Sequence, residues 1–209
     1  MSRKGIFVSF EGGEGSGKST QVKKLESFLK EKGFGVEVTR EPGGVHIAEH
    51  IRDILLDQEH TDMEPLAELL LYGAARAQFV PKVLRPALAE NDFVLSDRYT
   101  DSTEAYQGYG RRIDLGIVQE VMRIARKGLL PQVTYLLDVD PTIGVQRASK
   151  VAITRFEKEA LDFHHRVRRG FLAIAEREPE RVIVINAAPS MGEVFQAILK
   201  DFYCRFSSF

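Results

Sequence analysis

The segment Phe10–Thr20, FEGGEGSGKST, constrains the fold more than any other stretch of the sequence. It contains the pattern G-x-x-x-x-G-K-[ST], with Gly12, Gly17, Lys18 and Ser19 at the four defined positions. In such a loop, glycine keeps side chains away so that backbone N–H groups can surround a phosphate chain, and the next helix points its positive end at the anion. We therefore expect a phosphate-binding loop in which Lys18 contacts the outer phosphates and Ser19 ligates Mg²⁺.

The residues on both sides of this loop have the patterns that the motif needs. Residues 5–10 form a short apolar run bounded by glycine, which is typical of a buried parallel strand. After Lys18, apolar residues recur at helical spacing until Gly33. Strand, loop and helix therefore come in the required order, whereas a glycine-rich turn without a ligand would need no such order.

The remaining sequence alternates strand patterns with helix patterns. This alternation predicts an α/β fold of the P-loop NTPase type, in which helices cover both faces of a parallel five-stranded sheet and right-handed crossovers connect the strands. The four further strands are expected at residues 35–39, 92–97, 133–138 and 181–185.

Three of the expected helices have an apolar face. The second of them runs from about residue 63 to residue 89 with a break at Pro81 or Pro86, and the third begins with Asp114 as its N-cap. The apolar residues are Ile47, Ile51, Ile54 and Leu55 in the first helix, which is amphipathic, and Leu66, Leu70, Gly73, Ala77 and Val80 on one stripe of the second. In the third helix, the residues expected on the inner side are Ile117, Val118, Val121, Met122 and Ala125.

The composition of the 209-residue chain fits one domain with a sizeable core. Its formal net charge is −1, so it has neither the basic footprint of a nucleic-acid-binding protein nor an acidic tail. Cys204 is the single cysteine, which excludes an internal disulfide and fits a reducing compartment. No apolar run approaches the ~20 residues of a membrane helix, and residues 1–4 lead directly into the first strand, so no signal peptide is expected. We expect one domain over residues 1–209, located in the cytoplasm, without a nucleic-acid or membrane partner.

Charged residues follow several of the expected strands. Ligands of parallel sheets bind at the carboxyl ends of the strands, so the phosphate loop, residues 40–44 and the pair Asp97–Arg98 should meet in one site. Arg76 and the basic residues between 147 and 155 add positive charge. Each has an ordinary alternative, because isolated arginines often form surface ion pairs, Asp97 can cap a turn, and a charged run is usually a solvated face. Their common location around a phosphate loop favours phosphoryl transfer, which needs positioned reactants and cations.

Two classes of protein use such a site, namely small-molecule kinases and nucleotide-dependent switches or regulatory ATPases. A guanine-nucleotide switch would contain D-x-x-G after a strand and [NT]-K-x-D later, and neither pattern occurs in this sequence. Arg76 and Arg98, together with nearby aromatic residues, instead indicate a second anionic pocket for a phosphorylated acceptor with a flat ring. This combination favours a nucleoside monophosphate kinase.

Further segments make the chain resemble the bacterial thymidylate kinases over nearly its whole length. The phosphate loop is common to many proteins, whereas the whole series of segments is specific to that family. The segments that carry the resemblance are FEG at 10–12, REPGG at 40–44, ELLLY at 68–72 with RAQ at 76–78, DRY at 97–99, AYQG at 105–108 and LDVDP at 137–141.

The resemblance implies transfer of the γ-phosphoryl group of ATP to dTMP, which gives dTDP for dTTP synthesis, with Mg²⁺ as cofactor and a homodimer as assembly. It implies catalytic roles for Lys18 and Arg98. The residues implied for ATP are Gly12, Gly13, Glu14, Gly15, Ser16, Gly17, Lys18, Ser19, Thr20 and Arg147. The residues implied for dTMP are Glu14 near the sugar 3′-hydroxyl, Arg40 and Pro42 in a loop over the acceptor, Tyr72 stacked on thymine, Arg76 and Arg98 at the phosphate, Thr103 and Gln107 at the base edge, and Tyr106 under the sugar.

The segment from about residue 147 to residue 158 corresponds to the short lid of that family. Some members have their catalytic arginine in the phosphate loop and others have it in the lid, and this phosphate loop contains no arginine. The resemblance therefore implies Arg155 as the arginine that stabilises charge on the transferring phosphoryl group, supported by Arg147 and Lys150. The residues implied for the metal are Ser19, Asp97 and Glu157.

Phe79 stands where many members of that family have histidine, so any polar role there is unfilled. His164 and His165 suggest a metal site at first sight, but neighbouring residues on a helix point in different directions. We therefore expect a solvated histidine pair.

Overall fold

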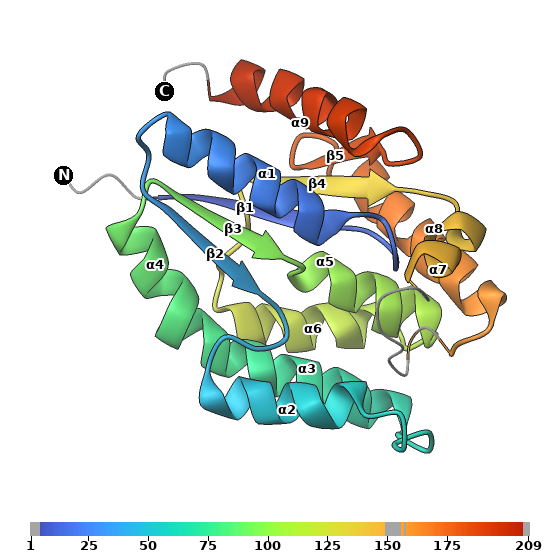
Figure 1. The fold of residues 1–209 in the computed structure, drawn as a ribbon. Coiled ribbons are helices and arrows are strands. Elements are labelled where there is room, and N and C mark those ends of the chain that lie inside the picture. The colour runs from blue at the N-terminus through green and yellow to red at the C-terminus, as the bar shows by residue number, and fades with distance from the viewer. Residues whose placement is uncertain (1–4, 149–155, 157, 207–209) are drawn as a thin grey trace.

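A parallel sheet of five strands, in the order β2-β3-β1-β4-β5, forms the centre of the computed structural model (Figure 1). The structure describes residues 5–148, 156 and 158–206. Each strand lies within one residue of its predicted bounds, and the predicted fold class is confirmed. The strands are β1 Ile6–Glu11, β2 Val36–Arg40, β3 Phe93–Asp97, β4 Val133–Asp138 and β5 Val182–Asn186.

Helices cover both faces of this sheet (Figure 1). Helices α1 and α9 lie on one face, while α4, α5, α8 and the π-helices η1 and η2 lie towards the other, and α2 and α3 lie furthest from the strands. No described helix is long and apolar enough to cross a membrane. The helices are α1 Lys18–Glu31, α2 His46–Leu56, α3 Pro65–Phe79, η1 Val80–Leu84, α4 Arg85–Glu90, α5 Thr100–Thr103, η2 Glu104–Gly110, α6 Leu115–Arg126, α7 Pro141–Ala148, α8 Leu161–Arg177 and α9 Met191–Arg205.

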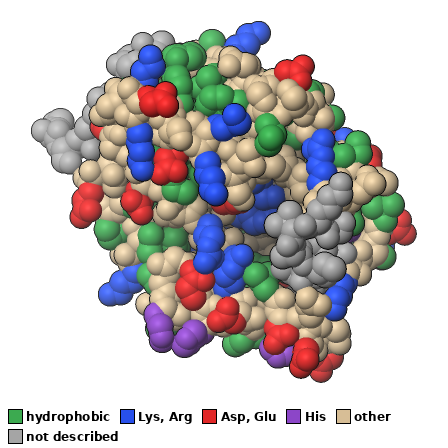
Figure 2. Space-filling view, viewed as in Figure 1, with side chains coloured by type: hydrophobic (Ala, Val, Ile, Leu, Met, Phe, Trp, Pro, Cys, Tyr) green, Lys and Arg blue, Asp and Glu red, His purple; other side chains and the backbone are tan. Residues whose placement is uncertain are grey.

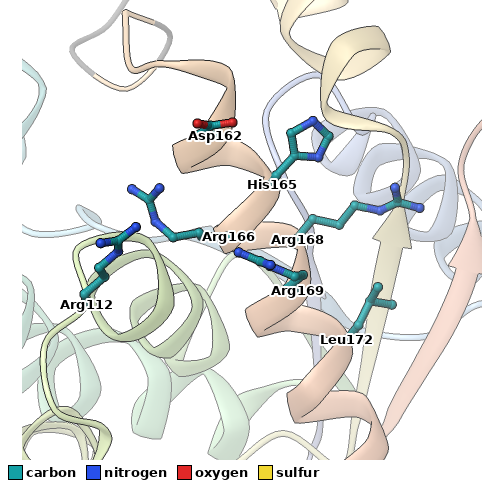
Figure 3. Close-up of a pocket in the computed structure, with 7 residues that line it drawn as sticks. All are labelled: Arg112, Asp162, His165, Arg166, Arg168, Arg169 and Leu172. Carbon is teal, nitrogen blue, oxygen red and sulfur yellow. The ribbon is translucent and has the colours of Figure 1, made fainter.

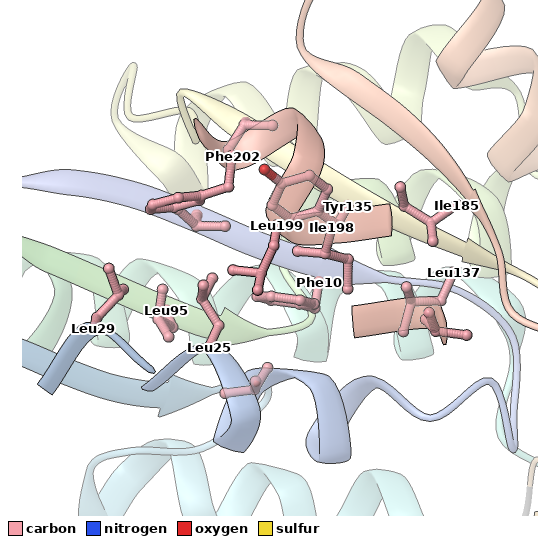
Figure 4. Close-up of a cluster of buried hydrophobic side chains, with 14 of the residues drawn as sticks. Phe10, Leu25, Leu29, Leu95, Tyr135, Leu137, Ile185, Ile198, Leu199 and Phe202 are labelled. Carbon is pink, nitrogen blue, oxygen red and sulfur yellow. The ribbon is translucent and has the colours of Figure 1, made fainter. Parts of the chain in front are cut away.

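The largest hydrophobic cluster fills the space between the sheet and helices α1 and α9 (Figure 4). Phe10 and Tyr135 reach it from adjacent strands, and Leu25 and Phe202 reach it from the two helices. Because helices cover both faces, neighbouring residues of one strand point into different clusters, and for that reason the strands read as continuous apolar runs in the sequence. This burial fixes the strand ends relative to one another.

The expected break in the long helix lies at Pro81. Proline has no backbone N–H to donate, and here α3 ends at Phe79, the π-helix η1 begins, and α4 continues to Glu90. The N-cap of α6 is also as predicted, because the Asp114 side chain accepts a hydrogen bond from the backbone N–H of Ile117.

The predicted inner side of α6 is wrong in part, because Val118, Met122 and Ala125 are buried as expected but Ile117 is exposed. The apolar faces of α2 and α3 are also partly exposed, with Ile47 at 55% and Leu70 at 52%. Helix α3 packs between α2 and α6, and these helices form an outer layer, so part of each apolar face turns away from the sheet. Periodicity identifies an apolar face but does not tell what covers it. The exposed residues of these apolar faces are Ile47, Ile54, Leu66, Leu70 and Ile117.

Candidate active site

A cavity of about 590 Å³ opens at the carboxyl ends of the strands. The register places these ends at one level, because Asp97 pairs with Phe10 of β1 and with Arg40 of β2. Figure 2 shows Lys and Arg side chains gathered around a hollow on this face. The expected residues that line the cavity are Glu14, Gly15, Gly17, Lys18, Ser19, Thr20, Arg40, Pro42, Tyr72, Arg76, Asp97, Arg98, Thr103, Tyr106, Gln107 and Arg147. Gly12, Gly13 and Ser16 belong to the same loop but do not line this cavity.

The phosphate loop wraps around the ammonium group of Lys18. Its Nζ donates hydrogen bonds to the backbone oxygens of Gly12 at 3.1 Å and of Gly13 at 2.9 Å. Burial, followed by repulsion from Arg98, lowers the pKa of Lys18 to about 8. Gly15 has φ 64°, and a Cβ there would collide with the backbone oxygen of Gly144, so the loop needs glycine at this position. A buried cation at the first residue of α1, where the backbone N–H groups of the helix begin, is suited to a phosphate chain.

Arg98 connects the phosphate loop with the helices that follow β3. Its Nη1 donates to the backbone oxygen of Gly12 at 3.1 Å and to Ser102 Oγ at 3.0 Å. Its Nη2 donates to Glu14 Oε1 at 2.8 Å and to Tyr106 Oη at 3.2 Å. The backbone of Arg98 has φ 72°, an unfavourable conformation for a residue other than glycine. Such strain is concentrated at functional sites, and here it places the guanidinium group in the cavity.

Glu14 is the ion-pair partner of Arg98, and the positive charges of Arg98 and Lys18 compensate the negative charge of Glu14. Burial alone would raise the pKa of Glu14, but attraction to Arg98 and Lys18 outweighs burial and lowers the pKa to about 2. The Tyr106 hydroxyl also donates a hydrogen bond to Glu14 Oε1 at 2.6 Å. The loop therefore contains a permanent carboxylate that orients one arginine and one tyrosine.

Arg76 is buried and bound to a carboxylate that the sequence did not indicate. Its Nε donates to Glu41 Oε2 at 2.6 Å, and its Nη1 donates to Thr103 Oγ1 at 3.0 Å. Burial raises the pKa of Glu41 more than Arg76 lowers it, and the second oxygen of Glu41 is buried without a hydrogen-bond partner among the described residues. Arg76 and Arg98 thus line the cavity that contains Lys18, as expected, but each is held by its own carboxylate.

Gln107 is fixed by a second buried carboxylate, Glu68. The amide nitrogen of Gln107 donates to Glu68 Oε1 at 2.7 Å. Arg111 donates to both oxygens of Glu68 and, at 2.5 Å, to Glu159, while its guanidinium group lies 4.8 Å from the ring centre of Phe163. Glu68 is fully buried, so this network determines how the Gln107 amide faces the cavity.

Ser19 and Asp97 lie together at the ends of the loop and of β3. The Ser19 hydroxyl donates to Asp97 Oδ2 at 2.5 Å. Within the described ranges, no group of three or more His, Cys, Asp or Glu side chains is placed to hold a metal. A hydroxyl and one carboxylate nevertheless suit Mg²⁺, which keeps several waters and takes its other ligands from substrate phosphates. The donor set therefore fits a magnesium ion bound together with a nucleotide.

Two expected basic residues have protein partners that the sequence did not reveal. Arg40 pairs with Glu49 at 2.9 Å and is half-exposed at the edge of the cavity. Arg147 donates to the backbone oxygens of Ala187 and Ala188, so it fixes the end of α7 to the loop after β5. Both line the cavity, but neither is a free cation in this structure.

Part of the expected lid lies outside the described residues. This applies to Lys150, Arg155 and Glu157. Phe156 is described, and its ring packs edge-on against Tyr106 with the ring centres 5.5 Å apart. The expectation of a solvated histidine pair is wrong for His164, which is buried beside Phe163.

Sequence reasoning also missed a buried carboxylate at the end of β1 and an arginine on α2. Glu11 accepts hydrogen bonds from the backbone N–H of Tyr99 at 2.7 Å and from Ser102 Oγ at 2.5 Å. Burial, followed by repulsion from Asp101, raises the pKa of Glu11 to about 7. Arg52 lines the cavity and donates to the backbone oxygen of Pro42. A carboxylate directly after the apolar run of residues 5–10 was the available signal for Glu11, whereas nothing in the sequence distinguished Arg52.

The fold and this cavity define a P-loop kinase of the nucleoside monophosphate class. The phosphate loop and a second cationic centre, formed by Arg76 and Arg98, share one site at the strand ends. A model of the family described as thymidylate kinase matches residues 10–198. The chain therefore belongs to the thymidylate kinase family, and the resemblance inferred from the sequence is confirmed.

Individual relatives agree with this assignment. The chain is 48% identical to the thymidylate kinase of Geobacillus sp. (strain WCH70), over 92% of this chain and 93% of the relative. It is 49% identical to that of Solidesulfovibrio magneticus, over 92% of this chain and 96% of the relative. The crystal structure of thymidylate kinase from Ehrlichia chaffeensis superimposes with a TM-score of 0.77 at 32% identity, and the match covers 95% of this chain and 99% of that one.

Proposed function

We propose that this protein is a thymidylate kinase, which transfers the γ-phosphoryl group of ATP to dTMP and so produces dTDP for dTTP synthesis. Membership of the family supports this activity. The observation that carries it is the single cavity in which Lys18 of the phosphate loop lies near Arg76 and Arg98. Two phosphorylated substrates need two cationic centres, and this cavity has both within one domain that we assign to residues 1–209.

The proposed donor site is the phosphate loop. Its backbone N–H groups and Lys18 bind the phosphates of ATP, with Arg147 nearby at the end of α7. Arg98 contacts the same loop through the backbone oxygen of Gly12. We assign to it the stabilisation of the negative charge that develops as the phosphoryl group is transferred. Arg155 keeps its assignment as the lid arginine on family resemblance alone, because it lies outside the described residues.

The proposed acceptor site lies between α3, β3 and η2. We assign the dTMP phosphate to Arg76 and Arg98, the thymine ring to Tyr72, and the base edge to Thr103 and Gln107. Tyr106 and Glu14 are assigned to the sugar, and Arg40 and Pro42 border the acceptor. All of these residues line the cavity described above, which supports a common ligand.

A panel of acceptors tests this proposal. In a coupled assay with ATP and Mg²⁺, we expect dTMP to be phosphorylated with the highest kcat/KM among dTMP, dUMP, dCMP and AMP. Faster turnover of AMP or dCMP would reject the thymidylate assignment but would leave the kinase fold intact. Denatured enzyme at the same concentration is the control for the coupling system.

We also propose that Ser19 and Asp97 hold Mg²⁺ together with ATP, either directly or through water, and that Glu157 assists. When bound, the ion neutralises phosphate charge.

We expect Asp97→Asn to raise the Mg²⁺ concentration needed for half-maximal rate by roughly fivefold, about 1 kcal/mol of lost ion binding. The measurement is a Mg²⁺ titration at saturating ATP and dTMP. Asp53→Asn, which removes an exposed carboxylate on α2, should leave the titration unchanged. An unchanged titration of Asp97→Asn would contradict the metal assignment.

A homodimer is the assembly that we propose, with the outer layer of α2, α3 and α6 as its interface. Large exposed apolar side chains gather on these three neighbouring helices, whereas an isolated domain usually exposes such residues singly. We expect Leu70→Glu to produce a monomer in sedimentation velocity, because it places a charge in the buried interface. The matched control is Met191→Glu, which changes an exposed apolar residue on α9. A dimeric Leu70→Glu protein would exclude this interface.

A further inference from the structure

Helix α8 and the turn after η2 form a second, strongly basic cavity. Its volume is about 520 Å³. Figure 3 shows the guanidinium groups of Arg112, Arg166 and Arg169 on one side of the cavity, while Arg168 extends the other way. Arg168 forms an ion pair with Asp138, with 2.7 Å between Nε and Oδ1. The charged and polar residues that line the cavity are Arg112, Asp162, His165, Arg166, Arg168 and Arg169.

Arg112, Arg166 and Arg169 have no carboxylate partner among the described residues, in contrast to Arg168, which lines the same cavity. Elsewhere in the protein, for example, Arg98 forms an ion pair with Glu14, and Arg177 forms one with Glu104. In the part of the chain that the structure describes, neither Arg112 nor Arg166 nor Arg169 forms an ion pair. Like charges held close together repel one another, and an anion placed between them removes that repulsion.

The backbone holds Arg112 in this position at a cost in energy. Its φ is 64°, in the left-handed region that residues other than glycine seldom adopt. The preceding residue, Arg111, is fixed inside the protein by Glu68 and Glu159, and the sharp turn after it lets Arg112 line the cavity instead. The geometry of this turn therefore sets the direction of the Arg112 side chain.

We propose that this cavity binds a polyphosphate anion. The planar fork of arginine matches the oxygens of a phosphate group, and three such forks can contact successive phosphates of one chain. The attraction of the three guanidinium groups grows with the charge of the anion, so a ligand with several negative charges is favoured over a monovalent one. Asp162 also borders the cavity and weakens this attraction. The polyphosphate can be inorganic or can be the triphosphate group of a nucleotide, and the two sources are distinguished below.

A bound polyphosphate would join two elements that border the active site. Arg112 follows η2, which carries Tyr106 and Gln107, and Arg166 and Arg169 belong to α8, which packs along η2. An anion between these arginines therefore holds η2 against α8. We expect it to raise the thermal midpoint of unfolding as its occupancy increases, since it binds only the folded protein.

Calorimetric titration with sodium tripolyphosphate tests the proposal. ADP and dTMP are present at saturating concentration, so that they fill the catalytic cleft. We expect Arg169→Gln to weaken binding about tenfold through loss of one charged fork. The charge-matched control is Arg123→Gln, which removes an exposed arginine on α6 and should leave the affinity unchanged. Asp162→Asn should bind severalfold more tightly. In parallel, the ¹³C-methyl signals of Leu172, which lines the cavity, should shift during the titration.

Equal affinities of the wild-type protein and Arg169→Gln would overturn the proposal, as would Leu172 methyl signals that do not move. Potassium chloride of matched ionic strength must not produce the same shifts; if it does, the effect is general screening and the proposal is wrong. Repeating the titration with a non-hydrolysable ATP analogue identifies the source. A nucleotide ligand should bind more tightly than tripolyphosphate and be weakened by Arg169→Gln, whereas an inorganic ligand should bind no more weakly than the nucleotide.

Discussion

Arg98→Ala is expected to lower kcat/KM for dTMP by roughly a hundredfold or more, on the order of 3 kcal/mol of transition-state stabilisation. The guanidinium group contacts the phosphate loop at Gly12 and the carboxylate of Glu14, and it lines the same cavity as Lys18. Its removal leaves the acceptor phosphate with one cationic partner fewer and releases Glu14. The measurement is steady-state kinetics with ATP and dTMP, with Lys18→Ala expected to show a loss of similar size.

Arg98→Lys separates the contribution of charge from that of geometry. Lysine keeps the positive charge but cannot reach Gly12 and Glu14 with one planar group, so we expect only part of the activity to return. Arg123→Ala, which removes an exposed arginine paired with Glu120, should behave like the wild type. Near-native kinetics of Arg98→Ala would contradict the role assigned to this residue in both the donor and the acceptor site.

The effect of Arg98 on stability has a defined pH dependence. Because the pKa of Glu14 is about 2 in the folded protein and near its ordinary value when unfolded, this carboxylate stabilises the fold above pH ~4.5 and loses that contribution as the pH falls towards 2. Arg98 is the main source of the lowered pKa. Urea unfolding should therefore show a difference between wild type and Arg98→Ala that is largest near neutral pH and shrinks in acid.

The frame of the site could be predicted from the sequence because its determinants are local. Buried parallel strands read as continuous apolar runs, and residues such as Asp97 and Arg98 lie at the end of one of them. The strand ends must then converge, whatever the distance between them in the sequence. That reasoning, applied to the sequence alone, brought Lys18, Arg40 and Arg98 together, and all three line one cavity.

The partners of these residues could not be predicted, because each contact joins distant parts of the chain. Glu41 binds Arg76, 35 residues away, and Arg147 is held by Ala187, 40 residues away. A sequence pattern shows that a carboxylate or a carbonyl exists but not which cation it meets. Which apolar side chains of α2 and α3 are exposed could not be predicted for a related reason, since helical periodicity is the same whether the apolar face meets the sheet or a second molecule.

Glu68→Gln is expected to reduce the preference for thymine over cytosine, because the carboxylate determines the orientation of the Gln107 amide. Both oxygens of Glu68 accept hydrogen bonds from Arg111, and Oε1 also accepts one from the amide nitrogen of Gln107. The amide oxygen of Gln107 is therefore the group left to face a base. It can accept the N3–H of thymine, whereas cytosine offers a lone pair at N3 and is repelled.

Glutamine at position 68 offers a donor as well as an acceptor, so the Gln107 amide can then rotate and present its nitrogen to the cavity. We expect the ratio of kcat/KM for dCMP to that for dTMP to rise roughly thirtyfold, about 2 kcal/mol of lost discrimination. The measurement is the kcat/KM ratio from parallel assays with both acceptors, at matched folded fractions verified by thermal unfolding.

Glu159→Gln is the matched control for this experiment. It removes the other carboxylate partner of Arg111 but leaves the hydrogen bond between Glu68 and Gln107 in place, so the base preference should not change. If Glu68→Gln keeps the wild-type ratio, the carboxylate does not orient the amide. If Glu159→Gln changes the ratio as much as Glu68→Gln does, the whole Arg111 network, rather than the single contact to Gln107, controls the choice of base.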